Sequence, residues 1–237
     1  MTLAQADTLH IAAAANLRFV LPELVDQFEQ QTDHHVSVSY AASGTLTTQI
    51  QHGAPFEVFL SASPDYIQRL IAAKLTQGKA INYAQAQLAL FAANDSPLVI
   101  EDKLHGLKQA IEQGTLGKIA IANPRHAPYG QAAESMLKEF GLWNQIQPYL
   151  LMAENASQAM QFALSTSVDA GFVPYAHIIQ PQFSLVGRFV QLDVTLQQQA
   201  IALHTASVSS KQFLDFIQTA QAHELFTKHG FLVKEAS

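Results

Sequence analysis

The fold is decided by the stretch Leu9–Tyr40, which reads LHIAAAANLRFVLPELVDQFEQQTDHHVSVSY. It opens with Leu9–Ala13, a short apolar run that is typical of a strand. Apolar residues then recur at steps of three and four across residues 17–28, which predicts one buried face of a helix with Asn16 as its N-cap. Val36–Tyr40 alternates valine with serine and predicts a second strand.

The rest of the chain repeats this order of strand and helix. Short apolar runs predict further strands at Val58–Leu60, Gln87–Ala92, Lys118–Ala122, Leu150–Met152, Ala170–Val173 and Ala200–His204. Apolar residues at helical spacing lie between most of them, with Pro64 and Asn155 at predicted helix starts and Gly53 and Gly141 at predicted helix ends. Strands that alternate with helices in this way predict an α/β class with mostly parallel sheets.

Length and two polar segments bear on the number of domains. The chain has 237 residues, enough for one large domain or for two smaller lobes. The segments 82–85 and 190–199 are polar and lack a strong period. They are candidates for the places where the chain crosses between two lobes.

The composition excludes several classes of protein. The net charge is −6, whereas a protein that neutralises phosphates is normally basic, so we expect no nucleic-acid partner. Hydrophobic residues make up 49% and charged residues 14%, which excludes a disordered chain. No apolar run reaches the length of a membrane span. Cysteine is absent, so disulfide scaffolds, thiolate metal sites and cysteine nucleophiles are excluded.

The N-terminal residues bear on the cellular location of the protein. Ala4-Gln5-Ala6 has the small-x-small form of a signal-peptidase site, although the charged and apolar regions that normally precede such a site are missing. We therefore expect a secreted, periplasmic protein whose signal peptide has been removed or truncated. A short N-terminus of a cytosolic protein is the alternative.

Four loops share one design, in which a strand ends, a small or amide residue follows, and a helix begins. They are Ala15-Asn16, Ser43-Gly44-Thr45, Pro128-Tyr129-Gly130 and Glu154-Asn155-Ala156. Helix N-termini present unpaired N–H groups and a partial positive charge, and several at one place bind an anion without lysine or arginine. Ordinary N-caps, which every α/β protein needs, give the same pattern, so each loop alone is ambiguous.

The sequence contains no clear pattern of catalytic or metal-binding residues. The ten histidines have no metal-ligand spacing, and no serine lies in a GxSxG turn. There is no GxGxxG loop and no P-loop lysine, so nucleotide binding is unsupported. No pattern brings together the carboxylates of Glu57, Asp65, Glu154 and Asp169. Arg125 is a candidate for the mouth of a cleft, where it would attract an anion.

The loops also carry a resemblance that covers nearly the whole chain in order. The pieces are Ala12–Leu17, Tyr40–Leu46, Gly53–Ala62, Ala122-Asn123-Pro124 with Ala127–Gly130, Gly171-Phe172-Val173, and Leu225-Phe226 with Gly230-Phe231. Together they resemble the periplasmic molybdate-binding proteins of ABC importers. That resemblance implies a type II periplasmic-binding-protein fold, in which two α/β lobes are joined by two crossing segments and close on a ligand cleft by a hinge. Lobe one would comprise residues 7–84 plus 198–237, and lobe two residues 85–197.

The resemblance also implies the binding residues, which fall on the same four loops. Ala15 and Asn16 match the first contact, where the family often has serine. Ser43 matches the second contact, Tyr129 the third, and Ala156 a backbone N–H contact. Asn16, Ser43 and Tyr129 would donate hydrogen bonds to molybdate oxygens rather than ligate the metal. Some members place a tyrosine after the strand that contains Gly171, but here Pro174 holds that position and Tyr175 is offset by one, so it is not assigned to the site.

The function implied is capture rather than catalysis. The protein would bind molybdate, and tungstate of nearly the same size, as a ligand and not as a cofactor. It would act as a monomer and deliver the oxyanion to the membrane permease of an ABC importer. The alternatives are a binder of another oxyanion such as sulfate or chromate, and an effector-sensing domain, because two-lobed α/β sensors share this architecture.

Overall fold

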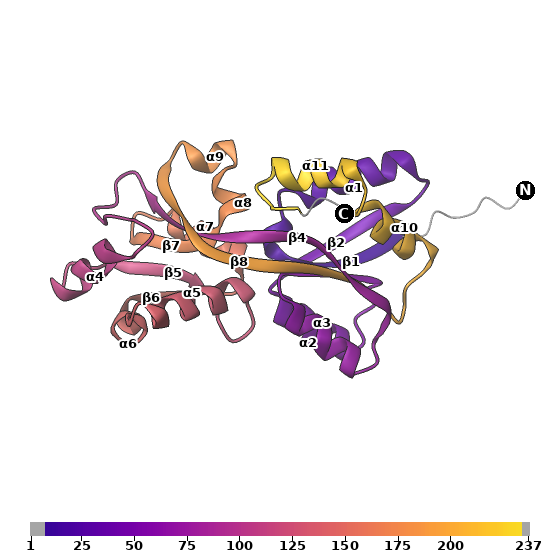
Figure 1. Cartoon of the computed structure of the whole chain (residues 1–237), viewed down its shortest axis with the longest axis horizontal. Coiled ribbons are helices and arrows are strands. Elements are labelled where there is room, and N and C mark those ends of the chain that lie inside the picture. Colours follow the sequence, from indigo (N-terminus) through magenta and orange to yellow (C-terminus); the bar gives the residue numbers. More distant parts are fainter. Residues whose placement is uncertain (1–7, 234–237) are drawn as a thin grey trace, which may run out of the picture. The chain divides into compact units, whose positions relative to one another are not determined.

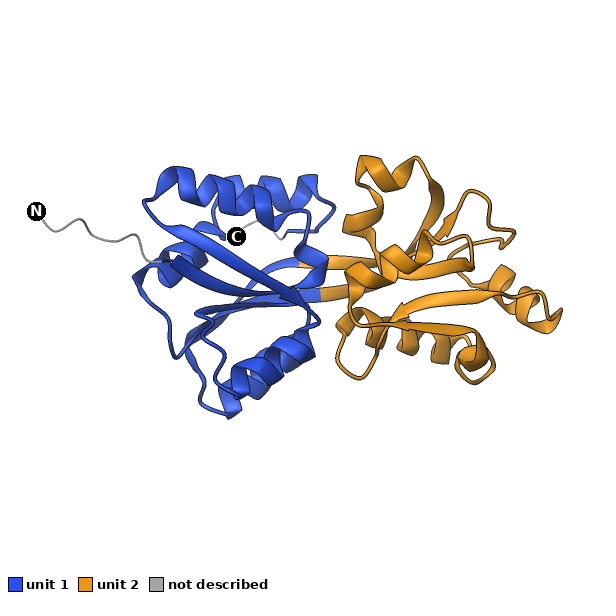
Figure 2. Ribbon diagram, turned by 180° about the vertical axis from the view of Figure 1, so that it is seen from behind, with its two compact units in different colours: residues 1–84, 197–237 blue, residues 85–196 orange. Residues whose placement is uncertain are grey.

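The computed structural model describes residues 8–233 and divides into two compact units (Figure 2). Unit 1 consists of the described residues up to Ala84 together with those from Gln197 onward, and unit 2 is Gln85–Leu196. The motif Ala4-Gln5-Ala6 lies outside the described residues. The chain therefore passes from one unit to the other twice.

The elements are labelled in Figure 1. The strands are β1 (Thr8–Ala14), β2 (His35–Ala41), β3 (Val58–Ser61), β4 (Thr76–Ala93), β5 (Lys118–Ala122), β6 (Leu150–Ala153), β7 (Val168–Pro174) and β8 (Gly187–Leu203). The helices of unit 1 are η1 (Ala15–Leu17), α1 (Leu21–Gln31), α2 (Ser43–Gln51), α3 (Pro64–Ala72), α10 (Val208–Phe216) and α11 (Ala220–Lys228). Those of unit 2 are α4 (His105–Glu112), α5 (Pro128–Glu139), α6 (Trp143–Ile146), η2 (Gln147–Tyr149), α7 (Ala156–Ala163), α8 (Tyr175–Ile178) and α9 (Pro181–Ser184).

In unit 1 the strands lie in the order β2-β1-β3-β8. β1 pairs in parallel with β2 and with β3, so these three strands end at one edge of the sheet. β8 pairs antiparallel with β3 and therefore starts its run through unit 1 at that same edge. α2 and α3 lie on one side of this sheet, and α1, α10 and α11 lie on the other (Figure 1).

The core of unit 1 follows from these two layers. On the side of α2 and α3, buried apolar residues from both helices pack against the sheet; they are Ala12, Leu46, Ile50, Phe59, Tyr66, Ile67, Leu70, Ile201 and Leu203. On the other side, the ring of Phe28 in α1 packs edge-on against Phe213 of α10, with 5.3 Å between centroids. Burial on both faces explains why β1 and β3 read as continuous apolar runs rather than alternating ones.

In unit 2 the strands lie in the order β4-β7-β5-β6. β5 pairs in parallel with β6 and with β7, whereas β4 pairs antiparallel with β7. Ala122, the last residue of β5, is in register with Ala153, the last residue of β6. Both strands therefore end at the same edge, next to the starts of α5 and α7.

The α/β class and the mostly parallel sheets predicted from the sequence are confirmed. The prediction that Asn16 caps a helix beginning at Leu17 is wrong, because Asn16 lies inside the short turn η1 and α1 begins only at Leu21. The polar segments 82–85 and 190–199 are not loops but parts of β4 and β8. In β8 the residues Leu192, Leu196, Gln198 and Ala200 are buried, so this strand does have a period of two.

One ion-pair cluster joins α1 to α11. Lys228 Nζ lies 2.7 Å from one carboxylate oxygen of Glu23, and His229 Nε2 lies 2.9 Å from the other. The hydrogen bond from Lys228 is the largest cause that lowers the pKa of Glu23 below its ordinary value of 4.5, and His229 adds to it while partial burial opposes it. A carboxylate with a depressed pKa stabilises the fold above its unfolded pKa and stops doing so as the pH falls through the folded pKa.

We expect Glu23→Gln to lower the melting temperature by about 1–2 °C at pH 7, since a largely solvated ion pair contributes about 0.5 kcal/mol. The difference should shrink below pH 4.5 because wild-type Glu23 then becomes protonated as well. Thermal melts of both proteins across this pH range measure it. Asp215→Asn, which breaks the exposed pair with Lys211, is the control and should change the melting temperature less. A larger loss for Glu23→Gln at pH 3.5 than at pH 7 would contradict the assignment.

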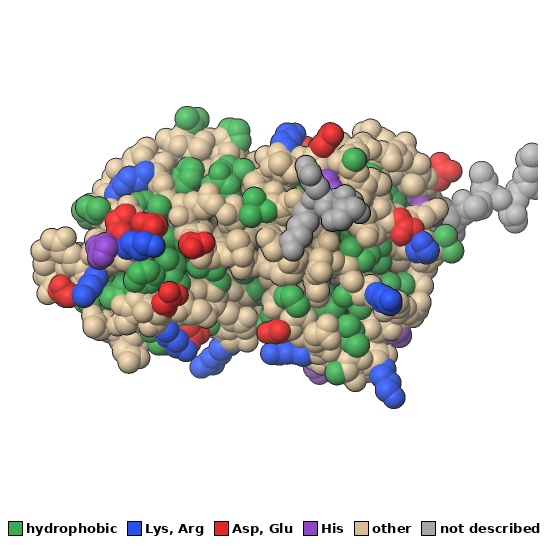
Figure 3. All heavy atoms as spheres, viewed as in Figure 1, with side chains coloured by type: hydrophobic (Ala, Val, Ile, Leu, Met, Phe, Trp, Pro, Cys, Tyr) green, Lys and Arg blue, Asp and Glu red, His purple; other side chains and the backbone are tan. Residues whose placement is uncertain are grey.

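Within residues 8–233, no helix is both long enough and apolar enough to cross a membrane. On the face shown in Figure 3, acidic and basic side chains of the described residues are interspersed, without a stripe of one sign.

Candidate functional site

The edge of unit 1 where β1, β2 and β3 end carries three of the sequence-predicted residues. Ala15 and Asn16 follow directly after β1, and Ser43 is the first residue of α2, two positions after β2. All three are buried, with exposed fractions of 2%, 1% and 0%. The parallel register puts the ends of β1 and β2 side by side, with Ala14 opposite Ala41. The fold thus brings these residues together from two separate loops.

Ser43 is held in place by hydrogen bonds to its side chain and to its backbone carbonyl. Its hydroxyl oxygen accepts a hydrogen bond from the backbone N–H of Ala62, just after β3, at 3.1 Å. Its carbonyl accepts one from the hydroxyl of Thr47 at 2.8 Å. The hydroxyl still has its own proton to donate to a further acceptor. The backbone amides of Ser43, Gly44 and Thr45 occupy the first turn of α2, where a helix offers no acceptor.

Asn16 is fixed by a residue that the sequence analysis did not assign to the site. Its side-chain nitrogen Nδ2 donates to Oε1 of Gln198 on β8 at 3.0 Å, and Gln198 is 0% exposed. The period of two in β8 is the signal that could have found Gln198, because it places this polar side chain at an inward position between Leu196 and Ala200. A buried glutamine in an apolar row needs a partner.

Unit 2 carries the other two predicted residues at a matching edge. Tyr129 is the second residue of α5, which follows β5, and Ala156 is the first residue of α7, which follows β6. Their exposed fractions are 2% and 5%. Since β5 and β6 end in register, the starts of α5 and α7 lie at one edge of the unit 2 sheet.

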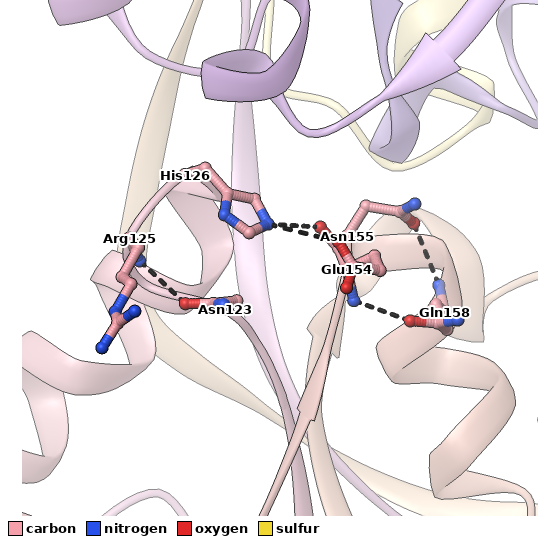
Figure 4. Close-up of polar contacts among 6 residues, drawn as sticks. All are labelled: Asn123, Arg125, His126, Glu154, Asn155 and Gln158. Carbon is pink, nitrogen blue, oxygen red and sulfur yellow. Dashed lines mark hydrogen bonds and ion pairs between the residues drawn. The ribbon is translucent and has the colours of Figure 1, made fainter.

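The start of α7 is capped and tied to the loop before α5 (Figure 4). Oδ1 of Asn155 accepts from the backbone N–H of Gln158 at 3.1 Å, which confirms Asn155 as the N-cap. His126 Nε2 lies 3.0 Å from the carbonyl oxygen of Glu154. The cap takes the third amide of the helix and leaves that of Ala156 in the first position, where helix geometry supplies no acceptor.

Arg125 is exposed, and its side chain points away from His126 and Asn155 (Figure 4). Its backbone N–H donates to Oδ1 of Asn123 at 3.1 Å, so the loop holds its main chain while the guanidinium stays in solvent. Within unit 2 the guanidinium is therefore not directed at the start of α7.

Gly130 allows α5 to begin close to the end of β5. A Cβ atom at this position would lie 2.0 Å from the carbonyl oxygen of Ala122 and 2.8 Å from the nitrogen of Pro124. Both are backbone atoms, so they cannot turn aside as a side chain would. Only glycine permits this approach, which sets where Tyr129 lies at the strand edge.

Comparison with known proteins identifies the family. Residues 9–232 match the family described as bacterial extracellular solute-binding protein. The chain belongs to this family. This solute-binding protein is 32% identical over 235 residues to the molybdate-binding protein ModA of Rhodobacter capsulatus, an alignment that covers 98% of this chain and 90% of that protein.

Solved structures agree with this assignment. The periplasmic molybdate-binding protein of Azotobacter vinelandii has a TM-score of 0.84 and 28% identity, with 96% of this chain and 100% of that one covered. The sulfate-binding protein SubI of Mycobacterium tuberculosis has a TM-score of 0.80 at 17% identity, covers 96% and 87% of the two chains, and shows a shared fold alone. The resemblance seen in the sequence is thus confirmed, and the solute-binding protein is a binding protein rather than an enzyme.

Two of the carboxylates that could have formed a catalytic pair are engaged with separate partners. Glu57 accepts from the backbone N–H of His10 and from the hydroxyl of Ser210, and so joins β1 to α10. Asp169 accepts from the backbone N–H of Gly117 at 2.6 Å. Among the described residues of this solute-binding protein, no group of three or more His, Asp or Glu side chains is placed to hold a metal ion.

Two tyrosines at the strand edges have other contacts. Tyr175 opens α8 and packs its ring edge-on against Phe189 of β8, with 6.0 Å between centroids. In unit 1, Arg18 lies over the ring of Tyr40 at 5.1 Å. Burial raises the pKa of Tyr40 to about 12, against the lowering effect of Arg18, so this hydroxyl stays protonated at physiological pH.

Proposed function

We propose that the protein captures molybdate, and also tungstate, in the periplasm and delivers it as a monomer to the membrane permease of an ABC importer. Several relatives are named molybdate-binding proteins, among them those of Rhodobacter capsulatus and Azotobacter vinelandii. The observation that carries the proposal is the pair of strand edges at which buried helix starts gather, one pair of loops in each unit. Ala15, Asn16 and Ser43 from unit 1 and Tyr129 and Ala156 from unit 2 are proposed to hold one and the same anion.

The donors proposed here are neutral. Backbone N–H groups of Ala15 and Ala156, the amide of Asn16 and the hydroxyls of Ser43 and Tyr129 supply hydrogen bonds without a lysine or arginine. Hydrogen bonds to a charged acceptor are shorter and roughly twice as strong as neutral ones. The partial positive charge at the starts of α2, α5 and α7 adds to them. Every oxygen of a dianion without protons can accept a hydrogen bond, so such an anion matches a site that contains only donors.

Selectivity follows from size and from protonation. Sulfate and phosphate are smaller than molybdate, so some donors would be too far away from their oxygens. Hydrogenphosphate also carries a proton that needs an acceptor, and a site made only of donors leaves that proton unpaired. Molybdate and tungstate differ little in size, so we expect both to bind.

A thermal melt tests the proposal. We expect 1 mM molybdate or tungstate to raise the melting temperature by about 10 °C, since a ligand at roughly 1,000 times its Kd stabilises by about 4 kcal/mol. Sulfate and phosphate at matched ionic strength are the controls and should leave it unchanged. An equal rise with sulfate would make the protein a binder of oxyanions without this selectivity. No rise with any of the four anions would refute anion capture.

A further inference from the structure

Three consecutive glutamines, Gln197–Gln199, mark the point where β8 enters unit 1. Each side chain reaches another element of that unit. Nε2 of Gln197 donates to the carbonyl oxygen of Ala84 at 3.0 Å, and Nε2 of Gln199 donates to Oδ1 of Asn82 at 2.8 Å, so both bind β4. Gln198 differs, because its side chain receives a hydrogen bond from a residue of the proposed anion site.

The contact between Gln198 and Asn16 joins two buried amides. Their exposed fractions are 0% and 1%, and the donor–acceptor distance is 3.0 Å. The pairing of strands accounts for their approach. Ala13, Leu60 and Ala200 form one row across β1, β3 and β8, and Asn16 and Gln198 lie just beyond that row at the same edge. β3 lies between β1 and β8 and pairs with both, so the sheet holds the two partners at a fixed separation.

The direction of this hydrogen bond matters for an anion. An amide has a donor nitrogen on one side and an acceptor oxygen on the other, and turning it by half a rotation exchanges them. In the structure Oε1 of Gln198 faces the nitrogen of Asn16 and not its oxygen. That nitrogen carries two hydrogens, one for Gln198 and one for a second acceptor. A turned amide would present its oxygen to the anion and repel it.

We propose that Gln198 is a positioning residue for anion binding, which fixes the Asn16 amide in the orientation that donates to the ligand. This inference rests on the proposed function, because it assigns the second hydrogen of Asn16 Nδ2 to the bound oxyanion. Gln198 itself acts through Asn16. The buried setting strengthens the effect, since a polar group that loses its partner costs more free energy when buried than when exposed.

A double-mutant cycle in molybdate affinity tests this role. Gln198→Met keeps the length of the side chain and removes the acceptor, and Asn16→Ala removes the residue through which Gln198 acts. Titration calorimetry with sodium molybdate should show a Kd raised about tenfold by Gln198→Met in the wild-type background. In the Asn16→Ala background the same change should alter the Kd by less than about twofold. Gln199→Met, its neighbour on the same strand, is the matched control and should bind like wild type.

A second readout concerns the ligand-free protein. The side-chain NH₂ signals of Asn16, assigned by their loss in Asn16→Ala, should shift in Gln198→Met and stay in place in Gln199→Met. If Gln198→Met does not fold, Gln198→Asn, which keeps an amide but shortens its reach, should show the same non-additive affinities.

The outcomes separate the inference from the proposed function. A wild-type protein that binds no molybdate would overturn both. A wild-type protein that binds, with Gln198→Met within twofold of it, would overturn the positioning role alone. An equal loss in both backgrounds, or an equal loss in Gln199→Met, would show that the strand and not Asn16 carries the effect.

Discussion

Replacing Ser43 by Ala and Tyr129 by Phe in one chain is expected to weaken molybdate binding by about 100-fold or more. A hydrogen bond to a charged group contributes roughly 1.5–3 kcal/mol, which is about tenfold or more in Kd for each donor. The two hydroxyls are proposed to bind the same anion from different units, so their losses should combine. Neither change removes a backbone donor or shortens a helix. Titration calorimetry with molybdate measures the effect.

Ser61→Ala is the control for this pair. Ser61 is as buried as Ser43 and lies at the same edge, but its hydroxyl already donates to the carbonyl oxygen of Ser63 at 2.8 Å. Its loss should lower stability without changing affinity. Ser43→Ala also removes the acceptor of the Ala62 amide, so a moderate fall in melting temperature is expected for both variants. A double variant that binds molybdate as tightly as wild type would remove Ser43 and Tyr129 from the site.

Replacing Gly130 by Ala is expected to lower the melting temperature by about 10 °C and to weaken molybdate binding. The added Cβ would lie 2.0 Å from the carbonyl oxygen of Ala122, so the start of α5 must move away from β5. Overpacking against backbone costs about 3 kcal/mol or more, and each kcal/mol corresponds to about 2–4 °C for a chain of this size. Tyr129 is the neighbouring residue and would move with the helix. Thermal melts with and without molybdate measure both effects.

The other end of α5 offers a matched control. Gly141 follows the helix with φ +70°, and a Cβ there would meet no atom within 4 Å. Gly141→Ala should therefore cost only the backbone strain of a left-handed residue, about 1 kcal/mol, and leave binding unchanged. Equal melting temperatures for the two variants would show that the close approach at Gly130 is not what holds α5.

The sequence pattern predicts the α/β class because its strongest signals are local. Apolar runs such as Val58–Leu60 and Lys118–Ala122 are strands in the structure, and Pro64 and Asn155 lie at helix starts as predicted. α4 lies in a stretch for which we predict no element. Leu107 and Ile111 are spaced as on one face of a helix, but the helix is only about two turns long and just one of its residues is buried.

Asn16 shows where the pattern fails. The apolar spacing from Leu17 to Phe28 fits one continuous helix, but Pro22 interrupts it. In a helix that began at Leu17, the ring of Pro22 would clash with the carbonyl of Arg18. Pro22 also has no backbone N–H to donate to that carbonyl. The chain instead forms the turn η1 and starts α1 at Leu21, with Pro22 in the first turn. The position of the proline therefore decides where the helix begins, although the hydrophobic spacing would fit an earlier start.

Gln198 shows a different limit. The sequence offers three glutamines in a row, and only their alternation with Leu196 and Ala200 indicates that Gln198 faces inward. Only the register of β8 against β3 places Gln198 near Asn16, which is 182 positions away in the chain. The loops of Ser43, Tyr129 and Ala156 could be predicted because each is a local junction of strand and helix. The contact between Gln198 and Asn16 depends instead on pairing between strands that lie far apart in the sequence.

The two passages of the chain between the units have a consequence for biosynthesis. Unit 2 is one uninterrupted stretch, whereas unit 1 needs the later part of β8 together with α10 and α11, which are synthesised after unit 2. Until Ile201 and Leu203 arrive, the apolar side chains of α2 and α3 lack part of their core. Phe226 also reaches back to stack on Tyr83, at 5.1 Å. Unit 1 therefore cannot complete its core before the whole of unit 2 has been synthesised.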